Sequence, residues 1–264
     1  MPHIASPTVL VFDSGLGGVT VYREIARARP DARLIYVADD AAFPYGDLAE
    51  NKLVGRVLKV VGDAAERCDP DLVVIACNTA STLALGDLRA RFSVPFVGTV
   101  PAIKPACAQS QSKHVAVLGT QATVSREYTR ALIREFAAGC KVTLVGSARL
   151  ATLAEADLNG RPPADEDIAA EIAPCFVLDG NRRVDTVVLA CTHYPLLLGR
   201  LRANAPWPVD WIDPAPAIAR RVVDLLGPTV PGRAAVPAQM LFTSGRLPPI
   251  ALTTALKAYG FNFL

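Results

Sequence analysis

VVIACNTASTL, residues 73–83, and VVLACTHYPLL, residues 187–197, each run through an apolar stretch into a cysteine and then into polar residues. Unbroken apolar runs of β-branched residues are typical of strands buried on both faces of a parallel sheet. Cys77 and Cys191 stand 114 positions apart (191 − 77) at matching points of these runs. A single buried cysteine is usually a small hydrophobe, whereas two in matching settings favour a shared chemistry.

The same kind of apolar run recurs along the chain and alternates with longer, helix-like stretches. The strand-like runs are TVLVF (8–12), RLIYVA (33–38), LVVIA (72–76), PFVGT (95–99), HVAVLG (114–119), KVTLVG (141–146), TVVLA (186–190) and VDWID (209–213). Amphipathic stretches over residues 50–67 and 125–138 predict helices between them. This alternation predicts an α/β fold with mostly parallel sheets.

An internal repeat follows from the two cysteine runs. FVGTVPAI, which begins at residue 96, aligns with WIDPAPAI, and Val97 and Ile212 are offset by 115 (212 − 97). VFDS (11–14) pairs with VLGT (117–120). Parallel α/β proteins share some self-similarity by chance, but the matched cysteines favour a true repeat. We therefore expect two pseudo-symmetric domains, each a mostly parallel sheet flanked by helices, with the active site in the cleft between them.

Composition narrows the function classes. The 264 residues carry a formal net charge of +2, 51% are hydrophobic and no basic block is present, which favours a globular protein without nucleic-acid or membrane partners. No apolar run is long enough to span a membrane, and the first residues make a poor signal peptide, so we expect a cytoplasmic protein. Six cysteines without a C-x-x-C pair indicate neither a disulfide framework nor a zinc site. The other four are expected to be buried hydrophobes: Cys68, Cys107, Cys140 and Cys175.

Two thiols on opposite sides of one pocket suit the inversion of a stereocentre. One group removes a proton from one face of the carbon, and the other returns a proton to the opposite face. A thiol has a pKa of ~8.5, near enough to neutrality for either form to be prepared. A position between a strand and a helix N-terminus would stabilise the thiolate and bind a substrate carboxylate.

Polar residues near the predicted strand ends are candidates for contacting a substrate. Asn78 and Thr79 follow the first cysteine, and Thr192 and His193 follow the second. Taken alone, each is better explained as a helix cap or a satisfied polar residue, but the matched placement of both tripeptides favours contact with a substrate. Asp13, in VFDSGLGG, suits an ammonium group or proton transfer, or caps the next helix. The loop DDAAFPYGD (39–47) and the stretch GTQAT (119–123) add three more candidates: Tyr45, Gly46 and Thr120.

DSGLGG, FPYGD, ACNTAS and ACTHYPLL, in this order, resemble the aspartate/glutamate racemase family over about residues 9–245. Relatives that act on aspartate or hydantoins typically have an acidic residue where His193 stands. The continuation HYPLL and the FPYG loop are therefore more similar to the branch of the family that acts on glutamate. The resemblance implies interconversion of L- and D-glutamate without a cofactor or a metal, which supplies D-glutamate for peptidoglycan.

The resemblance also implies roles for individual residues. Cys77 and Cys191 would transfer the protons, assisted by Asp13 and His193 respectively. The residues around the substrate would be Asp13, Ser14, Tyr45, Gly46, Asn78, Thr79, Thr120, Thr192 and His193. The first domain would comprise residues 1–99 plus 212–264, and the second residues 100–211.

The sequence departs from the family pattern in two places and leaves alternatives open. SARLATLAEA (147–156) stands where many members have a Cys-Pro-Leu type of stretch, so Glu155 is left off the expected site, and Asp40 replaces a small polar residue. The alternatives are a racemase of another amino acid such as aspartate, a non-catalytic amino-acid-binding protein, and a metal hydrolase using Cys191, His193 and Asp13. A homodimer is compatible with the sequence, which selects no surface for it.

Overall fold

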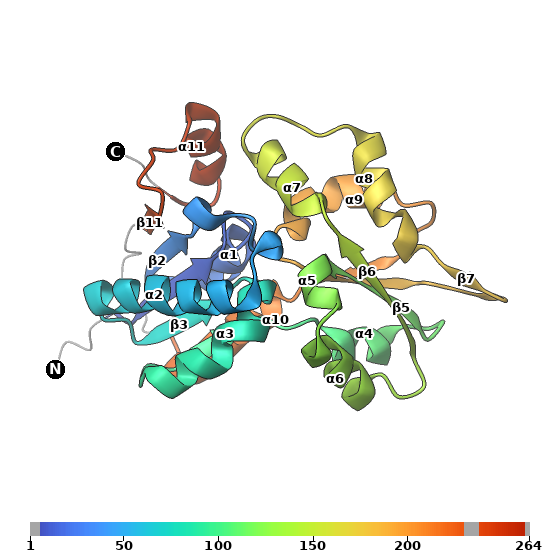
Figure 1. Cartoon of the computed structure of the whole chain (residues 1–264), viewed down its shortest axis with the longest axis horizontal. Coiled ribbons are helices and arrows are strands. Elements are labelled where there is room, and N and C mark those ends of the chain that lie inside the picture. The colour runs from blue at the N-terminus through green and yellow to red at the C-terminus, as the bar shows by residue number, and fades with distance from the viewer. Residues whose placement is uncertain (1–5, 230–237, 262–264) are drawn as a thin grey trace. The chain divides into compact units, whose positions relative to one another are not determined.

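The structure, a computed structural model, describes residues 6–229 and 238–261. The chain divides into two compact units, residues 1–99 with 215–264, and residues 100–214. Each unit contains one parallel sheet with helices packed against it (Figure 1). The chain is therefore of the mixed α/β class that the alternation of runs predicts.

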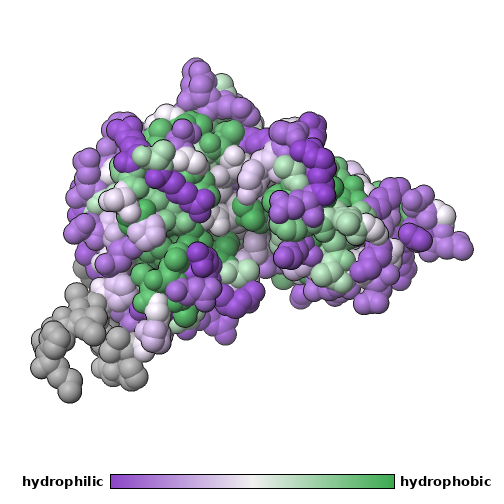
Figure 2. All heavy atoms as spheres, turned by 90° about the horizontal axis from the view of Figure 1, so that it is seen from below, coloured by the Kyte–Doolittle hydropathy of each residue, from purple (hydrophilic) through white to green (hydrophobic). Residues whose placement is uncertain are grey.

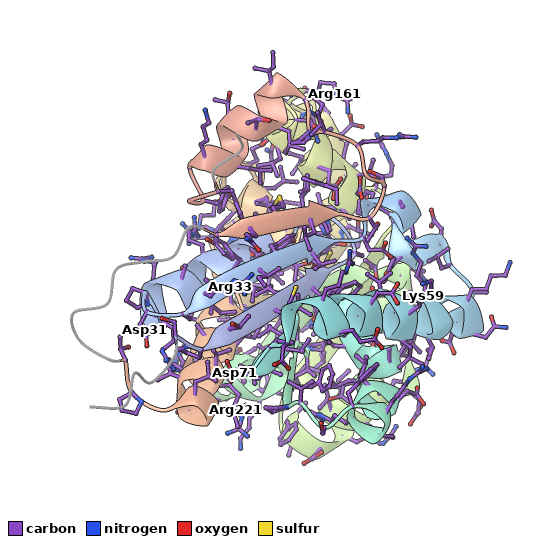
Figure 3. The ribbon with its side chains drawn as sticks, turned by 90° about the vertical axis from the view of Figure 1, so that its left-hand side faces the viewer. Asp31, Arg33, Lys59, Asp71, Arg161 and Arg221 are labelled. Carbon is purple, nitrogen blue, oxygen red and sulfur yellow. The ribbon has the colours of Figure 1, made fainter. Side chains whose placement is uncertain are left out.

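The first unit is built on a five-stranded sheet with the order β11-β2-β1-β3-β4. Its strands are β1 (Thr8–Asp13), β2 (Arg33–Ala38), β3 (Leu72–Ile75), β4 (Phe96–Gly98) and β11 (Gln239–Phe242). Every pairing in this sheet is parallel. Figure 3 shows β11 running beside β2, although some 200 residues separate them in the chain.

Helices α2 (Glu50–Cys68) and α3 (Asn78–Arg91) cover one face of this sheet. Leu53, Val57 and Val61 recur at four-residue spacing on α2, so they form one stripe that packs on the strands. Helices α1 (Val19–Ala28) and α10 (Ala215–Leu226) pack against each other in the same unit. The remaining elements of the unit are η1 (Asp40–Ala42), η2 (Tyr45–Asp47) and α11 (Ile250–Lys257).

The second unit is built on a four-stranded parallel sheet with the order β10-β9-β5-β6. Its strands are β5 (His114–Thr120), β6 (Lys141–Ser147), β9 (Thr186–Ala190) and β10 (Asp210–Ile212). Strands β7 (Leu178–Asp179) and β8 (Arg182–Arg183) form a separate antiparallel hairpin. Successive residues of β5 enter two different hydrophobic clusters, so both faces of this sheet are covered.

Helices of the second unit supply those two clusters. On one face pack α7 (Leu150–Leu158), α8 (Asp165–Ile172), α9 (Leu198–Ala203) and η4 (Tyr194–Leu197). On the other pack α4 (Ile103–Gln109) and α6 (Glu127–Phe136). The short elements α5 (Gln121–Val124) and η3 (Ala173–Cys175) complete the unit.

The predicted repeat is present in the strand order. Within the first sheet the strands run β2-β1-β3-β4, and the second sheet has the matching order β6-β5-β9-β10, with β11 as an addition. The units exchange their last helices, because β4 is followed by α4 of the second unit and β10 by α10 of the first. The two crossing points, Thr99 and Pro214, are offset by 115 (214 − 99), which equals the offset read between Val97 and Ile212.

Every strand predicted from an apolar run is present, within two residues at each end. Strand β11 and the hairpin were not predicted. Ile212 belongs to β10 of the second sheet, so the expected domain boundary at residue 212 is corrected: the first unit resumes at Ala215. Cys107 and Cys175 are buried as expected, but Cys68 and Cys140 are only half-buried.

Hydrophobic side chains reach the surface in patches between hydrophilic ones on the face that Figure 2 shows. Within the described part of the chain, the most exposed large hydrophobic residues are Leu247, Ile250 and Leu178. None of the helices within residues 6–229 and 238–261 combines the length and the hydropathy that crossing a membrane requires.

Candidate functional site

The candidate residues of the first unit gather at the carboxyl ends of three strands. Asp13 ends β1, Cys77 follows β3, and the loop that carries Tyr45 and Gly46 follows β2. Because β1 lies between β2 and β3 with all strands parallel, these ends meet at one edge of the sheet. Ligands of open α/β sheets bind at this edge.

Cys77 is the N-cap residue of α3, and its thiol is buried. Its Sγ atom accepts a hydrogen bond from the main-chain N–H of Ala80 at 3.4 Å. An N–H donor and the positive end of a helix both stabilise a thiolate over a thiol. The expectation of a thiol at a helix N-terminus is therefore confirmed for Cys77, and Asn78 and Thr79 do not cap this helix.

Asn78, the next residue in the chain, is 2% exposed. Neither its amide nitrogen nor its amide oxygen has a hydrogen-bond partner among the residues that the structure describes. A buried amide left without partners costs about 1–3 kcal/mol. Such a group is explained when a ligand completes its hydrogen bonds, because it offers donors to a carboxylate and an acceptor to an ammonium group.

Asp13 is fully buried, and its Oδ1 atom accepts a hydrogen bond from the N–H of Gly15 at 2.9 Å. It does not cap α1, whose N-cap residue is Gly18. Gly18 is required for space: a Cβ atom there would lie 2.8 Å from the Cβ of Asp13 and 3.0 Å from that of Ala76. The missing side chain therefore lets the loop after β1 settle against Asp13 and the residue before Cys77. Ser14 and Thr79 are buried in the same region.

Tyr45 is also buried, in the hydrophobic cluster that contains Cys77. Its hydroxyl donates to the carboxylate of Asp39 at 2.5 Å. Burial and the neighbouring Asp39 carboxylate raise the pKa of Tyr45, so its hydroxyl stays protonated. The hydroxyl is engaged by Asp39, whereas Gly46 is exposed, so its main chain is open to a ligand.

The second unit gathers its candidates in the same way. Cys191 and Thr192 follow β9 and are buried. Thr120 ends the neighbouring strand β5, and the pairing of Gly119 with Ala190 brings this end close to the end of β9. Thr120 caps α5, since its Oγ1 atom accepts the N–H of Thr123 at 3.2 Å. Cys191 is not an N-cap residue: a turn and then the 3₁₀ helix η4 follow it, with His193 at the N-cap. The expectation of a helix N-terminus at this thiol is corrected.

A histidine takes the place of the helix at the second thiol. Sγ of Cys191 lies 3.8 Å from Nδ1 of His193, and Nε2 of His193 lies 3.0 Å from Oε1 of Glu155. Burial would lower the pKa of His193, but the hydrogen bonds to Cys191 and Glu155 outweigh it and raise that pKa well above the ordinary value. A carboxylate can only accept, so Glu155 holds the Nε2 proton and turns Nδ1 toward the thiol.

Glu155, on α7, is a site residue that the sequence analysis left out. A signal was present, since this acid sits among alanines and leucines in ATLAEADL. Asp39 and Arg56 were missed too, because nothing in their local sequence sets them apart. Among the described residues, no group of three or more His, Cys, Asp or Glu side chains is placed to hold a metal ion.

Comparisons with known proteins identify the family. Residues 10–222 match the family described as Asp/Glu/Hydantoin racemase. The chain is 50% identical to the glutamate racemase of Brucella ovis, over 97% of this chain and 93% of that protein.

Two solved structures show the same fold. The first is an Escherichia coli glutamate racemase in complex with L-glutamate and the activator UDP-MurNAc-Ala, with a TM-score of 0.88 and 40% identity over 97% of this chain and 96% of that one. The second, a glutamate racemase from Aquifex pyrophilus, has a TM-score of 0.74 and 27% identity over 97% and 96%. The resemblance drawn from the four motifs is confirmed, and the chain belongs to the Asp/Glu/hydantoin racemase family.

Proposed function

We propose that this racemase interconverts L- and D-glutamate by a two-thiol proton transfer at the α-carbon, without a cofactor. The observation that carries the proposal is the matched placement of Cys77 and Cys191, which follow the equivalent strands β3 and β9 of two sheets with the same strand order. One thiolate removes the α-proton and the other thiol returns a proton to the opposite face.

The two thiols would be prepared for this work by different means. Cys77 has the N–H of Ala80 and the start of α3, which favour its thiolate. Cys191 has His193, whose Nδ1 atom takes the thiol proton while Glu155 holds the opposite ring nitrogen. When Cys191 must act as the acid, the same imidazolium returns that proton. Asp13 would assist Cys77 in the corresponding way.

Binding would use the polar groups that surround the strand ends. The amide of Asn78, left unpartnered within the described residues, would hydrogen-bond the substrate, with hydroxyls and the Gly46 main chain around it. These groups remain the proposed set: Asp13, Ser14, Tyr45, Gly46, Asn78, Thr79, Thr120, Thr192 and His193. Hydrogen-bond donors that bind the substrate carboxylate more strongly as it gains charge in the transition state also lower the activation barrier.

Glutamate is proposed over aspartate because relatives at 50% and 40% identity are named glutamate racemases. A histidine at position 193, where aspartate-specific relatives typically carry an acid, agrees with this choice. The product D-glutamate would supply peptidoglycan synthesis. We place the reaction in the cytoplasm, where the reducing environment keeps both thiols reduced.

The test follows optical rotation or circular dichroism of L-glutamate and of L-aspartate with the purified protein, without added pyridoxal phosphate. The proposal expects loss of the glutamate signal and little change with aspartate. Cys77→Ser and Cys191→Ser should each lower kcat/KM by roughly 10²–10⁴-fold, the usual contribution of a proton-transfer group. Cys175→Ala, at a buried thiol of the second unit, is the matched control. Stable glutamate rotation, or full activity in either serine variant, would overturn the proposal.

A further inference from the structure

A buried carboxylate outside the proton-transfer groups lies behind the FPYG loop. Asp39, which follows β2, is 0% exposed. Its two oxygens accept hydrogen bonds from the hydroxyl of Tyr45 at 2.5 Å and from that of Thr243 at 2.5 Å. They also accept Nε and Nη2 of Arg56 at 2.6 Å and 2.5 Å. One carboxylate thus joins the loop with η2, helix α2 and the segment after β11.

The carboxylate of Asp39 is held as an anion. Burial would raise its pKa, but the hydrogen bonds from Arg56, Thr243 and Tyr45 outweigh burial and lower it. A buried charge is costly unless it is paired and its lone pairs are used, and here two bonds come from a single guanidinium. The cluster therefore has one favoured geometry, which fixes the direction of the Tyr45 hydroxyl.

A second carboxylate, that of Asp40, binds the same segment after β11. Asp40 accepts the main-chain N–H of Ser244 at 2.9 Å and its hydroxyl at 2.5 Å. The N–H of Thr243 donates to the carbonyl of Ala38 at 3.0 Å. Residues 243–244 therefore extend the parallel pairing of β11 with β2 and lie against the start of the loop. The unexpected Asp40 is explained by this contact.

We propose that Asp39 is the positioning residue of the FPYG loop, and that Arg56 and Thr243 hold it so that Tyr45 presents the Gly46 main chain to the substrate. The inference rests on the proposed function, in which this loop contacts glutamate. A loop that contacts the substrate equally before and during proton transfer contributes to KM and little to kcat. Substrate affinity then depends on Thr243, far from the thiols in the sequence.

Two conservative variants test this without removing the buried charge. Tyr45→Phe deletes only the hydroxyl that meets Asp39, and Thr243→Val keeps its shape while deleting the other donor. Each should raise KM for glutamate roughly tenfold and leave kcat within about twofold, the pattern of lost uniform binding. Because both act through Asp39, the double variant should raise KM by less than the product of the single effects.

Variants of Arg56 test whether a conservative replacement restores substrate affinity, and another residue of α2 supplies the control. Arg56→Met should raise KM, and Arg56→Lys, which retains the charge without the paired hydrogen bonds, should restore part of the affinity. Lys59 lies on the same helix (Figure 3), and its ammonium pairs with the exposed Asp63 at 2.7 Å, so Lys59→Met should keep the wild-type KM.

The outcomes separate the two proposals. Racemisation by the wild type with an unchanged KM in both Tyr45→Phe and Thr243→Val would overturn the positioning role, even if their melting temperatures fall. A fall in kcat at constant KM would overturn it as well. Absence of racemisation in the wild type would instead overturn the proposed function.

Discussion

Nδ1 of His193 lies 3.8 Å from Sγ of Cys191, while the opposite ring nitrogen lies 3.0 Å from the Glu155 carboxylate. At the other thiol, the Sγ atom of Cys77 accepts a hydrogen bond from the N–H of Ala80 at the start of helix α3. The two thiols, which follow equivalent strands of a repeated fold, therefore have different neighbouring groups. The thiol of Cys191 meets an imidazole that titrates, and the thiol of Cys77 meets fixed dipoles of the main chain.

The first prediction concerns His193→Gln. Losing the proton acceptor of Cys191 should lower kcat/KM by roughly 10²-fold or more. The loss must be equal for L- and D-glutamate, because the equilibrium constant between enantiomers is 1. His114→Gln is the control, since His114 is a buried histidine at the opposite end of β5, bonded to Thr143 at 3.0 Å. Full activity of His193→Gln would contradict the coupling of this ring to the thiol.

A second prediction concerns the two buried histidines as a function of pH. The pKa of His193 is raised by Cys191 and Glu155 against burial, whereas burial and Lys141 lower the pKa of His114. At pH 7 the NMR signals of the imidazole carbons should show a charged ring for His193 and a neutral one for His114. Glu155→Gln should lower the pKa of His193. A neutral His193 at pH 7 in the wild type would contradict the arrangement.

The raised pKa of His193 also predicts how the free energy of unfolding depends on pH. A pKa raised on folding means that the native state binds its proton more tightly than the unfolded state, whose histidine has a pKa of about 6.5. The contribution of His193 to the free energy of unfolding is then complete below pH ~6.5 and is lost as pH rises through the native pKa. Denaturant titrations of wild type and His193→Gln should therefore converge toward alkaline pH. Divergence in that direction would show the opposite sign.

Glycines of the first unit offer a matched pair for the packing around Asp13. Gly18→Ala places a Cβ 2.8 Å from that of Asp13 and should lower the free energy of unfolding by about 1–3 kcal/mol, with a loss of activity. Gly55, inside α2, has nothing within 4 Å of a Cβ, so Gly55→Ala should stabilise the protein by about 0.5–1 kcal/mol. Chemical denaturation measures both, and equal effects would contradict the close approach at Gly18.

Most of the strand framework could be predicted because strands covered on both faces give unbroken apolar runs, as in residues 72–76 and 186–190. Strand β11 escaped prediction because QMLF is a short edge strand with alternating exposure. Its partner β2 lies some 200 residues away, and no local pattern records that pairing.

The residues of the candidate site also divide into those that a local sequence pattern reveals and those that only the fold brings together. Cys77, Asn78, Cys191 and His193 could be found because they sit directly after strands and repeat as a pair of motifs. Glu155 and Asp39 act through contacts across the fold, with His193 and with Thr243 respectively, and only folding brings these groups together. Cys191 does not begin a helix as expected, because η4 starts only after His193, and the imidazole of His193 stands beside the thiol instead.

The most direct test of the two-thiol reaction is the fate of the α-proton at early times. Wild-type protein is incubated with L-glutamate in deuterium oxide, and proton NMR follows the separated enantiomers. Transfer by two thiols predicts D-glutamate that carries deuterium at the α-carbon from its first appearance, while the remaining L-glutamate keeps its proton. D-glutamate that retains the substrate's own α-proton would show a single group acting on both faces and would contradict the account.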